Sequence, residues 1–311
     1  MAFAETQYPI RHFIDLREIP KAELRKIVDT AIEVKQGFKR GYVYQPLPGK
    51  IMGMIFEKRS TRTRISFEVG MRDLGGYSIN LSSDQIQIGR GETIHDTAKV
   101  LSRYVDVIMI RADKHETVLG LAEHGHIPVI NGLTDKSHPC QIMADVMTFE
   151  EHRGPIAGRT LAWIGDGNNV ATSLIEGAAQ FDYRLHLACP KELQPSKEAV
   201  DWARKQGAQI ELFDTPQEAV KNVDAVFSDC WVSMGDTDAE MRHKVLAPFQ
   251  VNEALMKLAN KEALFMHCLP AHRGEEVTAE VIDGPQSVVF DEAENRLHAQ
   301  KAILLWCFKV I

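Results

Sequence analysis

Short apolar runs alternate with longer amphipathic segments along most of the chain. Runs such as Ile51–Phe56 and Leu264–His267 are almost uninterrupted by polar residues, which is typical of strands buried on both faces of a parallel sheet. Between such runs, apolar residues recur at the three- and four-residue spacing of a helix, as they do over 20–35. This alternation predicts an α/β fold in which helices cover parallel sheets.

The alternation occurs twice, because it restarts after the turn-forming segment Arg153–Pro155. Two series of strands and helices predict two doubly wound parallel-sheet domains with a seam near residues 145–157. The expected strands are 51–56, 78–81, 105–110, 128–131, 160–164, 184–188, 210–213, 225–229 and 264–267, with a short apolar run at 287–290. The main expected helices are 20–35, 64–74, 92–103, 118–124, 139–152, one that begins near 169, and 292–309.

Length and cysteine usage refine this picture. The 311 residues favour two domains, because single hydrophobic cores stop growing near roughly 250–300 residues. No apolar run approaches the roughly 20 residues that span a bilayer, and residues 1–11 lack the apolar segment of a signal peptide. The five cysteines include no Cys-x-x-Cys pair, which argues against a disulfide framework and favours a cytoplasmic protein.

Charge and histidine spacing exclude further classes. The net charge of −7 argues against a nucleic-acid or membrane partner, although a local basic pocket stays compatible with it. The chain has no His-Glu-x-x-His motif, and His124 and His126 are spaced too closely to share one helix face. The sequence therefore predicts no metal site.

The clearest chemical signal is the segment Ser60–Arg64, which lies between an expected strand and an expected helix. A helix N-terminus offers unpaired N–H groups, and hydroxyl and guanidinium groups add donors suited to a phosphate. The alternative is a capping serine beside a solvated charge cluster. Arg111 follows another strand, which places it near the same edge of the sheet, and His138–Gln141 precedes a helix, where a histidine and a glutamine could donate to a carbonyl or phosphate oxygen; each also has a purely structural interpretation.

The second half offers weaker signals. Gly165–Val170 begins like a dinucleotide-binding turn, but Val170 replaces the third small residue and no acidic residue ends the next strand. Its asparagines could instead recognise a small polar ligand. Asp229 ends a strand, where a carboxylate can pair with an ammonium group or cap a turn. Cys268 also follows a strand. Its sequence position is compatible with a nucleophile, a ligand-contacting thiol or a buried cysteine.

Four motifs in this order resemble the aspartate/ornithine transcarbamylase family over nearly the whole chain. They are Ser-Thr-Arg-Thr-Arg at 60–64, His-Pro-Cys-Gln at 138–141, Asp-Cys-Trp-Val-Ser-Met-Gly at 229–235 and His-Cys-Leu-Pro at 267–270. The last two are of the ornithine type. The resemblance implies a carbamoyl phosphate-binding domain over 1–145, an ornithine-binding domain over 146–291, and a C-terminal helix over 292–311 that packs back on the first domain. The active site is expected in the cleft between the domains.

The resemblance also implies the site residues. Arg111, His138, Gln141, Asp229 and Cys268 are the expected catalytic residues. The carbamoyl phosphate site is expected at Ser60, Thr61, Arg62, Thr63, Gln87, Arg111, His138, Pro139, Cys140, Gln141, Cys268, Leu269 and Arg296. The ornithine site is expected at Asn169, Asp229, Ser233 and Met234. Gln87 lies in a loop that reaches a neighbouring subunit in this family, which implies a homotrimer or an assembly of trimers.

The implied activity is transfer of a carbamoyl group from carbamoyl phosphate to the side-chain amine of L-ornithine, giving L-citrulline and phosphate in arginine biosynthesis, with no cofactor. The amine must lose a proton before attack, and either Asp229 or Cys268 is a candidate to take it. Three alternatives stay open. They are a transcarbamylase with another amine acceptor such as putrescine, a nicotinamide dehydrogenase built on the Gly165 turn, and a catalytically silent binding subunit.

Overall fold

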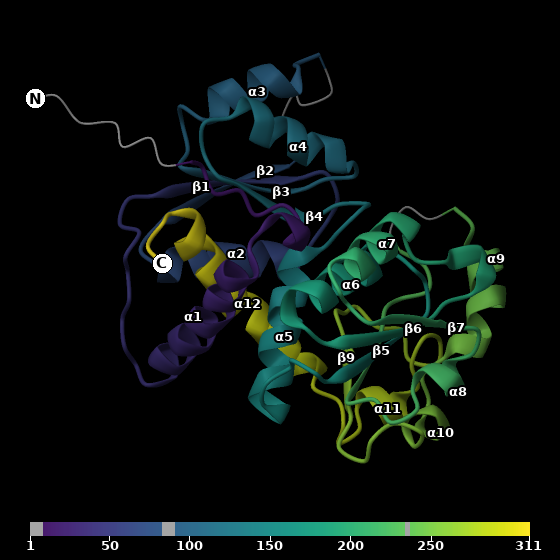
Figure 1. The fold of residues 1–311 in the computed structure, drawn as a ribbon. Coiled ribbons are helices and arrows are strands. Elements are labelled where there is room, and N and C mark those ends of the chain that lie inside the picture. The colour runs from purple at the N-terminus through teal and green to yellow at the C-terminus, as the bar shows by residue number, and fades with distance from the viewer. Residues whose placement is uncertain (1–8, 83–90, 234–236) are drawn as a thin grey trace, which may run out of the picture.

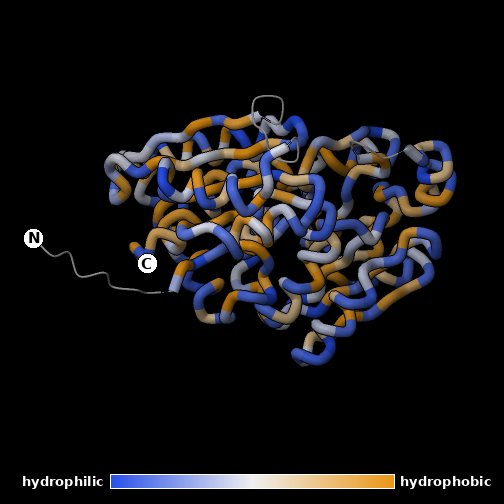
Figure 2. The backbone as a smooth tube through the Cα atoms, turned by 90° about the horizontal axis from the view of Figure 1, so that it is seen from above, coloured by the Kyte–Doolittle hydropathy of each residue, from blue (hydrophilic) through white to orange (hydrophobic). Residues whose placement is uncertain are grey.

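The computed structural model describes residues 9–82, 91–233 and 237–311, and Figure 1 shows two lobes that are each built on a parallel sheet. The predicted α/β class with two doubly wound parallel sheets is therefore confirmed. In Figure 2, hydrophobic stretches occur in both lobes and alternate with hydrophilic ones, as expected for strands and helices that share buried cores. No helix in the described ranges is long and apolar enough to cross a membrane.

The first sheet has the strand order β2-β1-β3-β4, with all neighbours parallel. Its strands are β1 (Ile51–Phe56), β2 (Tyr77–Ser82), β3 (Val107–Arg111) and β4 (Val129–Leu133). The helices of this half are α1 (Lys21–Lys39), α2 (Arg62–Asp73), α3 (Ile94–Leu101), α4 (His115–His124) and α5 (Pro139–Arg153), after a short 3-10 turn at Leu16–Glu18.

Successive residues of β1 point to opposite faces of this sheet, and both faces are covered. Met52 and Met54 share one hydrophobic core with α1, α2 and the C-terminal helix, whereas Ile55 packs in another core with α3 and α4. Burying each such side chain contributes about 1.5–3 kcal/mol, which explains why this strand has almost no polar residues. Helices on both faces leave the carboxyl ends of the strands free to form a site.

The second sheet has the strand order β7-β6-β5-β8-β9 and is also parallel throughout. Its strands are β5 (Thr160–Ile164), β6 (Arg184–Ala188), β7 (Ile210–Phe213), β8 (Ala225–Ser228) and β9 (Leu264–His267). The α-helices are α6 (Asn169–Phe181), α7 (Lys197–Lys205), α8 (Pro216–Ala219), α9 (Ala239–Leu246), α10 (Glu253–Met256), α11 (Ala279–Ile282) and α12 (Val289–Cys307). Two 3-10 turns, Lys191–Leu193 and Ala247–Phe249, complete this half.

The C-terminal helix α12 connects the two halves of the molecule. It packs against α1, α2 and α5, and its first turns also contact β9 of the second sheet (Figure 1, yellow). The helix α5 in turn contacts α6, so that α5 and α12 lie between the two sheets. Side chains that leave these two helices therefore reach both halves.

Several predicted boundaries shift in the structure. The last helix begins at Val289 rather than at 292, because Asp291 and Glu292 lie in its first turn, where acidic side chains favour a helix N-terminus. The apolar run 287–290 is thus divided between an isolated bridge at Ser287 and this helix. Helix α2 starts at Arg62, two residues before the predicted position, which brings the Ser60–Arg64 motif onto its first turn.

Candidate active site

The carboxyl ends of three neighbouring strands bring the first group of predicted residues together. The segment Ser60–Thr63 follows β1, Arg111 is the last residue of β3, and His138 precedes α5 after β4. Because these strands are parallel and adjacent, all three segments lie at the same edge of the sheet. Arg111 Nη1 donates to Ser60 Oγ over 3.3 Å, which connects the segments after β1 and β3 directly.

The helices that begin at this edge have N-termini without a side-chain cap. Thr61 is the N-cap residue of α2 and His138 that of α5, and no described side chain accepts a hydrogen bond from either first turn as a cap. Elsewhere, Thr93, Asn168 and Ser196 do cap their helices. The alternative of Ser60 as a capping serine is therefore wrong. Two uncapped helix ends leave N–H groups and positive dipole ends for an anion.

Arg296 reaches this edge from α12. It is only 3 % exposed, and its Nη1 donates to Gln141 Oε1 over 2.6 Å while its Nη2 donates to Thr63 Oγ1 over 3.2 Å. A buried guanidinium therefore joins the first turns of α2 and α5. The resemblance had implied this residue, although it lies far along the chain from the other three segments.

The electrostatics of this edge suit an anion. Burial lowers the pKa of His138 well below its usual value, and the positive charges of Arg296, Arg111 and Arg62 lower it further. Burial and the neighbouring Arg296 likewise lower the pKa of Arg111 to about 10. Among the described residues, His138 Nδ1, Arg111 Nε and Arg296 Nε are buried without a hydrogen-bond partner. Positive charge and polar groups thus converge here, and a phosphate would satisfy them.

Two carboxyl groups lie behind Gln141, and sequence reasoning missed both. Gln141 Nε2 donates to Asp145 Oδ1 over 2.8 Å and to Glu292 Oε1 over 2.7 Å. Burial and the negative charge of Asp145 raise the pKa of Glu292 well above its usual value, and burial raises the pKa of Asp145 to about 7. Helical spacing was the available signal, because Asp145 follows Gln141 by four residues and Glu292 precedes Arg296 by four.

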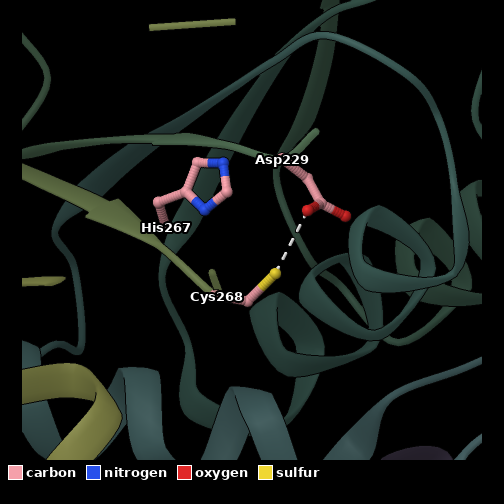
Figure 3. Close-up of side chains that lie close together, drawn as sticks. All are labelled: Asp229, His267 and Cys268. Atoms are coloured by element: carbon pink, nitrogen blue, oxygen red, sulfur yellow. Dashed lines mark hydrogen bonds between the residues drawn. The ribbon is translucent and has the colours of Figure 1, made fainter. Parts of the chain in front are cut away.

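The second group of predicted residues gathers at the carboxyl ends of β8 and β9. Cys268 Sγ donates to Asp229 Oδ1 over 3.2 Å, and Figure 3 shows this sulfur pointing at the carboxylate while the His267 ring lies to one side. The Cys230 backbone N–H also donates to Asp229 Oδ1, over 2.8 Å. Asn168 Nδ2 donates to Asp229 Oδ2 over 2.8 Å. Both oxygens of this carboxylate are therefore held in fixed directions.

The thiol of Cys268 is a hydrogen-bond donor here. Burial and the charge of Asp229 raise its pKa well above the ordinary cysteine value, which disfavours the thiolate. Burial also raises the pKa of Cys140, to about 12, and its sulfur donates to the Asn131 carbonyl. Of the two proton acceptors left open by the sequence, Asp229 is therefore favoured over Cys268. Cys140 and Pro139 lie buried in the first turn of α5.

The remaining predicted residues have mixed outcomes. Asn169 turns toward the first half and donates to the Thr134 carbonyl over 2.6 Å, whereas the neighbouring Asn168 contacts Asp229. Ser233 is exposed, and its Oγ lies 3.6 Å from Cys230 Sγ. Leu269 is half-buried with a left-handed φ of 57°. Gln87 and Met234 lie outside the described residues.

The turn after β5 argues against a dinucleotide. A Cβ on Gly167 would lie 2.3 Å from the Pro195 nitrogen and 2.4 Å from the Gln194 carbonyl carbon, so the chain itself occupies the space beside this glycine. In a dinucleotide-binding turn, the second glycine allows the pyrophosphate to approach the backbone. Here Gly167 instead allows the chain at Gln194 and Pro195 to pack against it. Asn168 caps α6 by accepting from the Val170 and Ala171 N–H groups.

Within the part of the chain that the structure describes, two groups of side chains have the geometry to hold a metal ion. The ligand atoms of Asp229, His267 and Cys268 lie within 4.8 Å of one another, as do those of His272, Glu275 and Glu276. In the first group, the sulfur donates to Asp229, and His267 Nδ1 accepts from the Leu269 N–H over 2.9 Å. These hydrogen bonds explain why the three side chains lie close together.

The fold and site define a two-lobed α/β protein with a largely buried cluster of arginine and histidine side chains at the edge of one sheet and the Asp229–Cys268 pair at the edge of the other. The chain belongs to the aspartate/ornithine carbamoyltransferase family. Residues 11–151 match the carbamoyl-P binding domain of this family, and residues 157–307 match its Asp/Orn binding domain.

Relatives and solved structures agree with this assignment. The chain is 61% identical to an ornithine carbamoyltransferase of Rhodopseudomonas palustris over 97% of each chain, and 60% identical to one of Brucella abortus over 96% of each. It superposes on the ornithine carbamoyltransferase of Pyrococcus furiosus with a TM-score of 0.92 at 48% identity, over 95% of this chain and 96% of that one. The anabolic enzyme of Campylobacter jejuni gives a TM-score of 0.91 at 39% identity, over 97% and 100%.

Proposed function

We propose that this chain transfers the carbamoyl group of carbamoyl phosphate to the side-chain amine of L-ornithine, giving L-citrulline and phosphate in arginine biosynthesis. The observation that carries the proposal is the pair of half-sites, a guanidinium-rich one around Arg111 and Arg296 and one around the Asp229 carboxylate. They lie within electrostatic reach of each other, because the negative charge of Asp229 raises the pKa of Arg111. Relatives about 60% identical over nearly the full length bear the name of this activity.

The guanidinium-rich half-site would bind carbamoyl phosphate. The phosphate accepts from Ser60–Thr63 and the first turn of α2, and Arg62 is half-buried beside it. Arg111 and His138 stabilise negative charge on the carbamoyl oxygen, a contribution often worth a few kcal/mol for each donor. Gln141 Oε1 faces Arg296 and keeps a second lone pair for the carbamoyl NH2 group.

The half-site around the Asp229 carboxylate would bind ornithine and remove a proton from its amine. The amine nitrogen attacks the carbamoyl carbon, a C–N bond forms, and the C–O bond to phosphate breaks. An ammonium group with an ordinary pKa near roughly 10.4 must first lose a proton, and Asp229 is placed to hold it. Cys268 orients Asp229 by donating to it, and Asn168 orients its other oxygen. Asn169, Ser233 and Met234 complete the ornithine site in this proposal.

The same proposal includes the organisation of the chain. Residues 1–145 with the helix 292–311 form the carbamoyl phosphate-binding domain, and residues 146–291 form the ornithine-binding domain. The contacts of α12 with α1 and α2 support this division, with α5 extending across the boundary. The protein works in the cytoplasm as a homotrimer or an assembly of trimers, without a cofactor. Sedimentation equilibrium that returns the mass of one chain would contradict the assembly.

A panel of acceptors tests the activity. Purified protein is incubated with carbamoyl phosphate and, in turn, ornithine, putrescine, aspartate or N-acetylornithine, and the ureido product is measured. We expect turnover with ornithine to exceed that with every other acceptor, because ornithine alone offers both the free amine and the free α-amino acid group. Faster turnover with putrescine would establish the alternative transcarbamylase. Absence of product with all four acceptors would contradict the proposed function itself.

A further inference from the structure

We propose that Glu292, together with Asp145, is a positioning residue that fixes Gln141 in the carbamoyl phosphate site and the His267–Leu269 turn in the amine site at the same time. This inference rests on the proposed function, because it assigns a role within that reaction. Glu292 and Asp145 themselves are buried behind the reacting groups, at 1 % and 3 % exposure, so they act through their neighbours.

The first half of the argument concerns the direction of the Gln141 amide. Both carboxyl groups accept from Gln141 Nε2, over 2.7 Å for Glu292 and 2.8 Å for Asp145. An amide nitrogen only donates, so two acceptors on one side force the oxygen to the other side, where it accepts from Arg296. The carboxyl pair therefore determines which atom of Gln141 faces the anion site.

The second half concerns the turn that carries the thiol. Glu292 Oε2 accepts the His267 backbone N–H over 2.9 Å, and His267 Nδ1 in turn accepts the Leu269 N–H over 2.9 Å. Cys268 lies between these two anchored N–H groups, and its sulfur points at Asp229 (Figure 3). One side chain from the first turn of α12 thus holds residues that come from α5 and from the end of β9.

The charge of the pair supports this role. The two buried carboxyl groups meet at the same Gln141 nitrogen, where two negative charges side by side are unfavourable. Burial raises the pKa of both groups, and the charge of Asp145 raises that of Glu292 further, so the pair favours a state that shares one proton. The pair then has a single negative charge beside the buried guanidinium of Arg296, whose charge acts on both carboxyl groups. A neutral side chain of the right length should therefore replace Glu292 well.

The experiment compares three substitutions in the full-length protein by ornithine-dependent turnover. Glu292→Gln keeps an acceptor for the His267 N–H and a donor for Asp145, and it loses only the acceptor for Gln141 Nε2, which Asp145 still holds, so we expect kcat within about fivefold of the unmodified protein. Glu292→Met has similar length but no hydrogen bonds, and we expect kcat to fall about 10- to 100-fold. Glu292→Asp keeps the carboxyl group but is one methylene shorter and cannot span both partners, so we expect it to be less active than Glu292→Gln.

The matched control is Asn295→Ala. Asn295 lies one turn further along α12, is fully buried, and bonds to Thr148 and Glu151 of the same helix α5 without contacting the site. We expect this variant to lower the melting temperature while kcat stays unchanged. In Glu292→Met, by contrast, kcat should fall while inhibition by inorganic phosphate changes less than about threefold, because the Ser60–Thr63 segment remains.

The outcomes separate the two proposals. If the unmodified protein makes no ureido product, the proposed function fails before any variant is compared. If it is active and Glu292→Met behaves like Asn295→Ala, with a lower melting temperature and unchanged kcat, the positioning role is overturned. Should Glu292→Met not fold, the remaining pair decides. Glu292→Asp at least as active as Glu292→Gln overturns the role, and the reverse order supports it.

Discussion

The anion side and the amine side of the active site differ in how their polar groups are satisfied. On the anion side, Arg111, His138 and Arg296 each keep a buried nitrogen for which the described residues provide no partner. On the amine side, both oxygens of Asp229 already accept hydrogen bonds from neighbouring groups. The anion side therefore has more polar nitrogens than the described residues can pair. On the amine side, the Asp229 carboxylate is an acceptor that is held in a fixed direction before any amine binds.

This difference assigns different tasks to the two halves. Clustered positive charges lower the pKa values of their neighbours, so a dianion that relieves them binds strongly, and charge should decide affinity on the anion side. On the amine side the carboxylate gains little from further donors, and its orientation should decide the rate. Substitutions that change either the charge of the anion side or the orientation of Asp229 can therefore test this division of tasks.

The largest effect is expected for Arg62→Ala on the anion side. Removing this half-buried guanidinium takes away charge-assisted bonds to the phosphate, so we expect carbamoyl phosphate to bind about 100- to 1000-fold more weakly. Arg64→Ala is the matched control, because Arg64 lies on the same helix but is exposed. Titration calorimetry with carbamoyl phosphate measures both. Equal affinities of the two variants would remove Arg62 from the anion site.

The next effect is expected for Asp229→Asn on the amine side. The Asn168 oxygen caps α6, so Asn168 cannot turn its amide and its Nδ2 still faces residue 229. An asparagine at 229 would turn either its nitrogen or its oxygen toward this Nδ2, and in both orientations the proton acceptor is lost. We expect kcat to fall about 100-fold while carbamoyl phosphate affinity is retained. The control is Asp224→Asn at the other end of β8, which should lower stability without changing kcat. Similar kcat values for both variants would contradict the role of Asp229.

The sequence predicted the fold well because both sheets are parallel and buried. Strands such as Ile51–Phe56 and Thr160–Ile164 face a core on each side, so their apolar character is continuous and their bounds agree with β1 and β5. Residues directly after such strands, Arg111 and Asp229 among them, were recognisable for the same reason. Helix ends were less predictable, as the start of α12 at Val289 illustrates.

What sequence could not supply was the choice of partner across the fold. Asn169 is expected in the ornithine site, and its Nδ2 donates to the Thr134 carbonyl, whereas the neighbouring Asn168 donates to Asp229, a contact that the sequence did not indicate. Glu292 was overlooked because its partners on α5 and β9 are remote in sequence. Local sequence patterns identify the edge of the sheet at which polar side chains gather. Tertiary packing decides which of these side chains contact each other.

The smallest effect is expected for Cys268→Ser, and it separates orientation from proton transfer. A serine hydroxyl still donates to Asp229, so we expect turnover and ornithine affinity to change about three- to tenfold. Burial and Asp229 raise the pKa of Cys268 well above its usual value, whereas burial and three arginines lower that of His138, so neither group changes charge near neutral pH.

The pH profile of the same variant completes the comparison. Only the neutral amine attacks, and its ordinary pKa is near roughly 10.4, so kcat/KM for ornithine should rise about tenfold for each pH unit between about pH 7 and 9. The slope should be the same in Cys268→Ser, because the thiol orients Asp229 and takes no proton itself. A variant with a different slope would make Cys268 the proton acceptor. A variant with unchanged turnover and affinity would show instead that this side of Asp229 needs no donor.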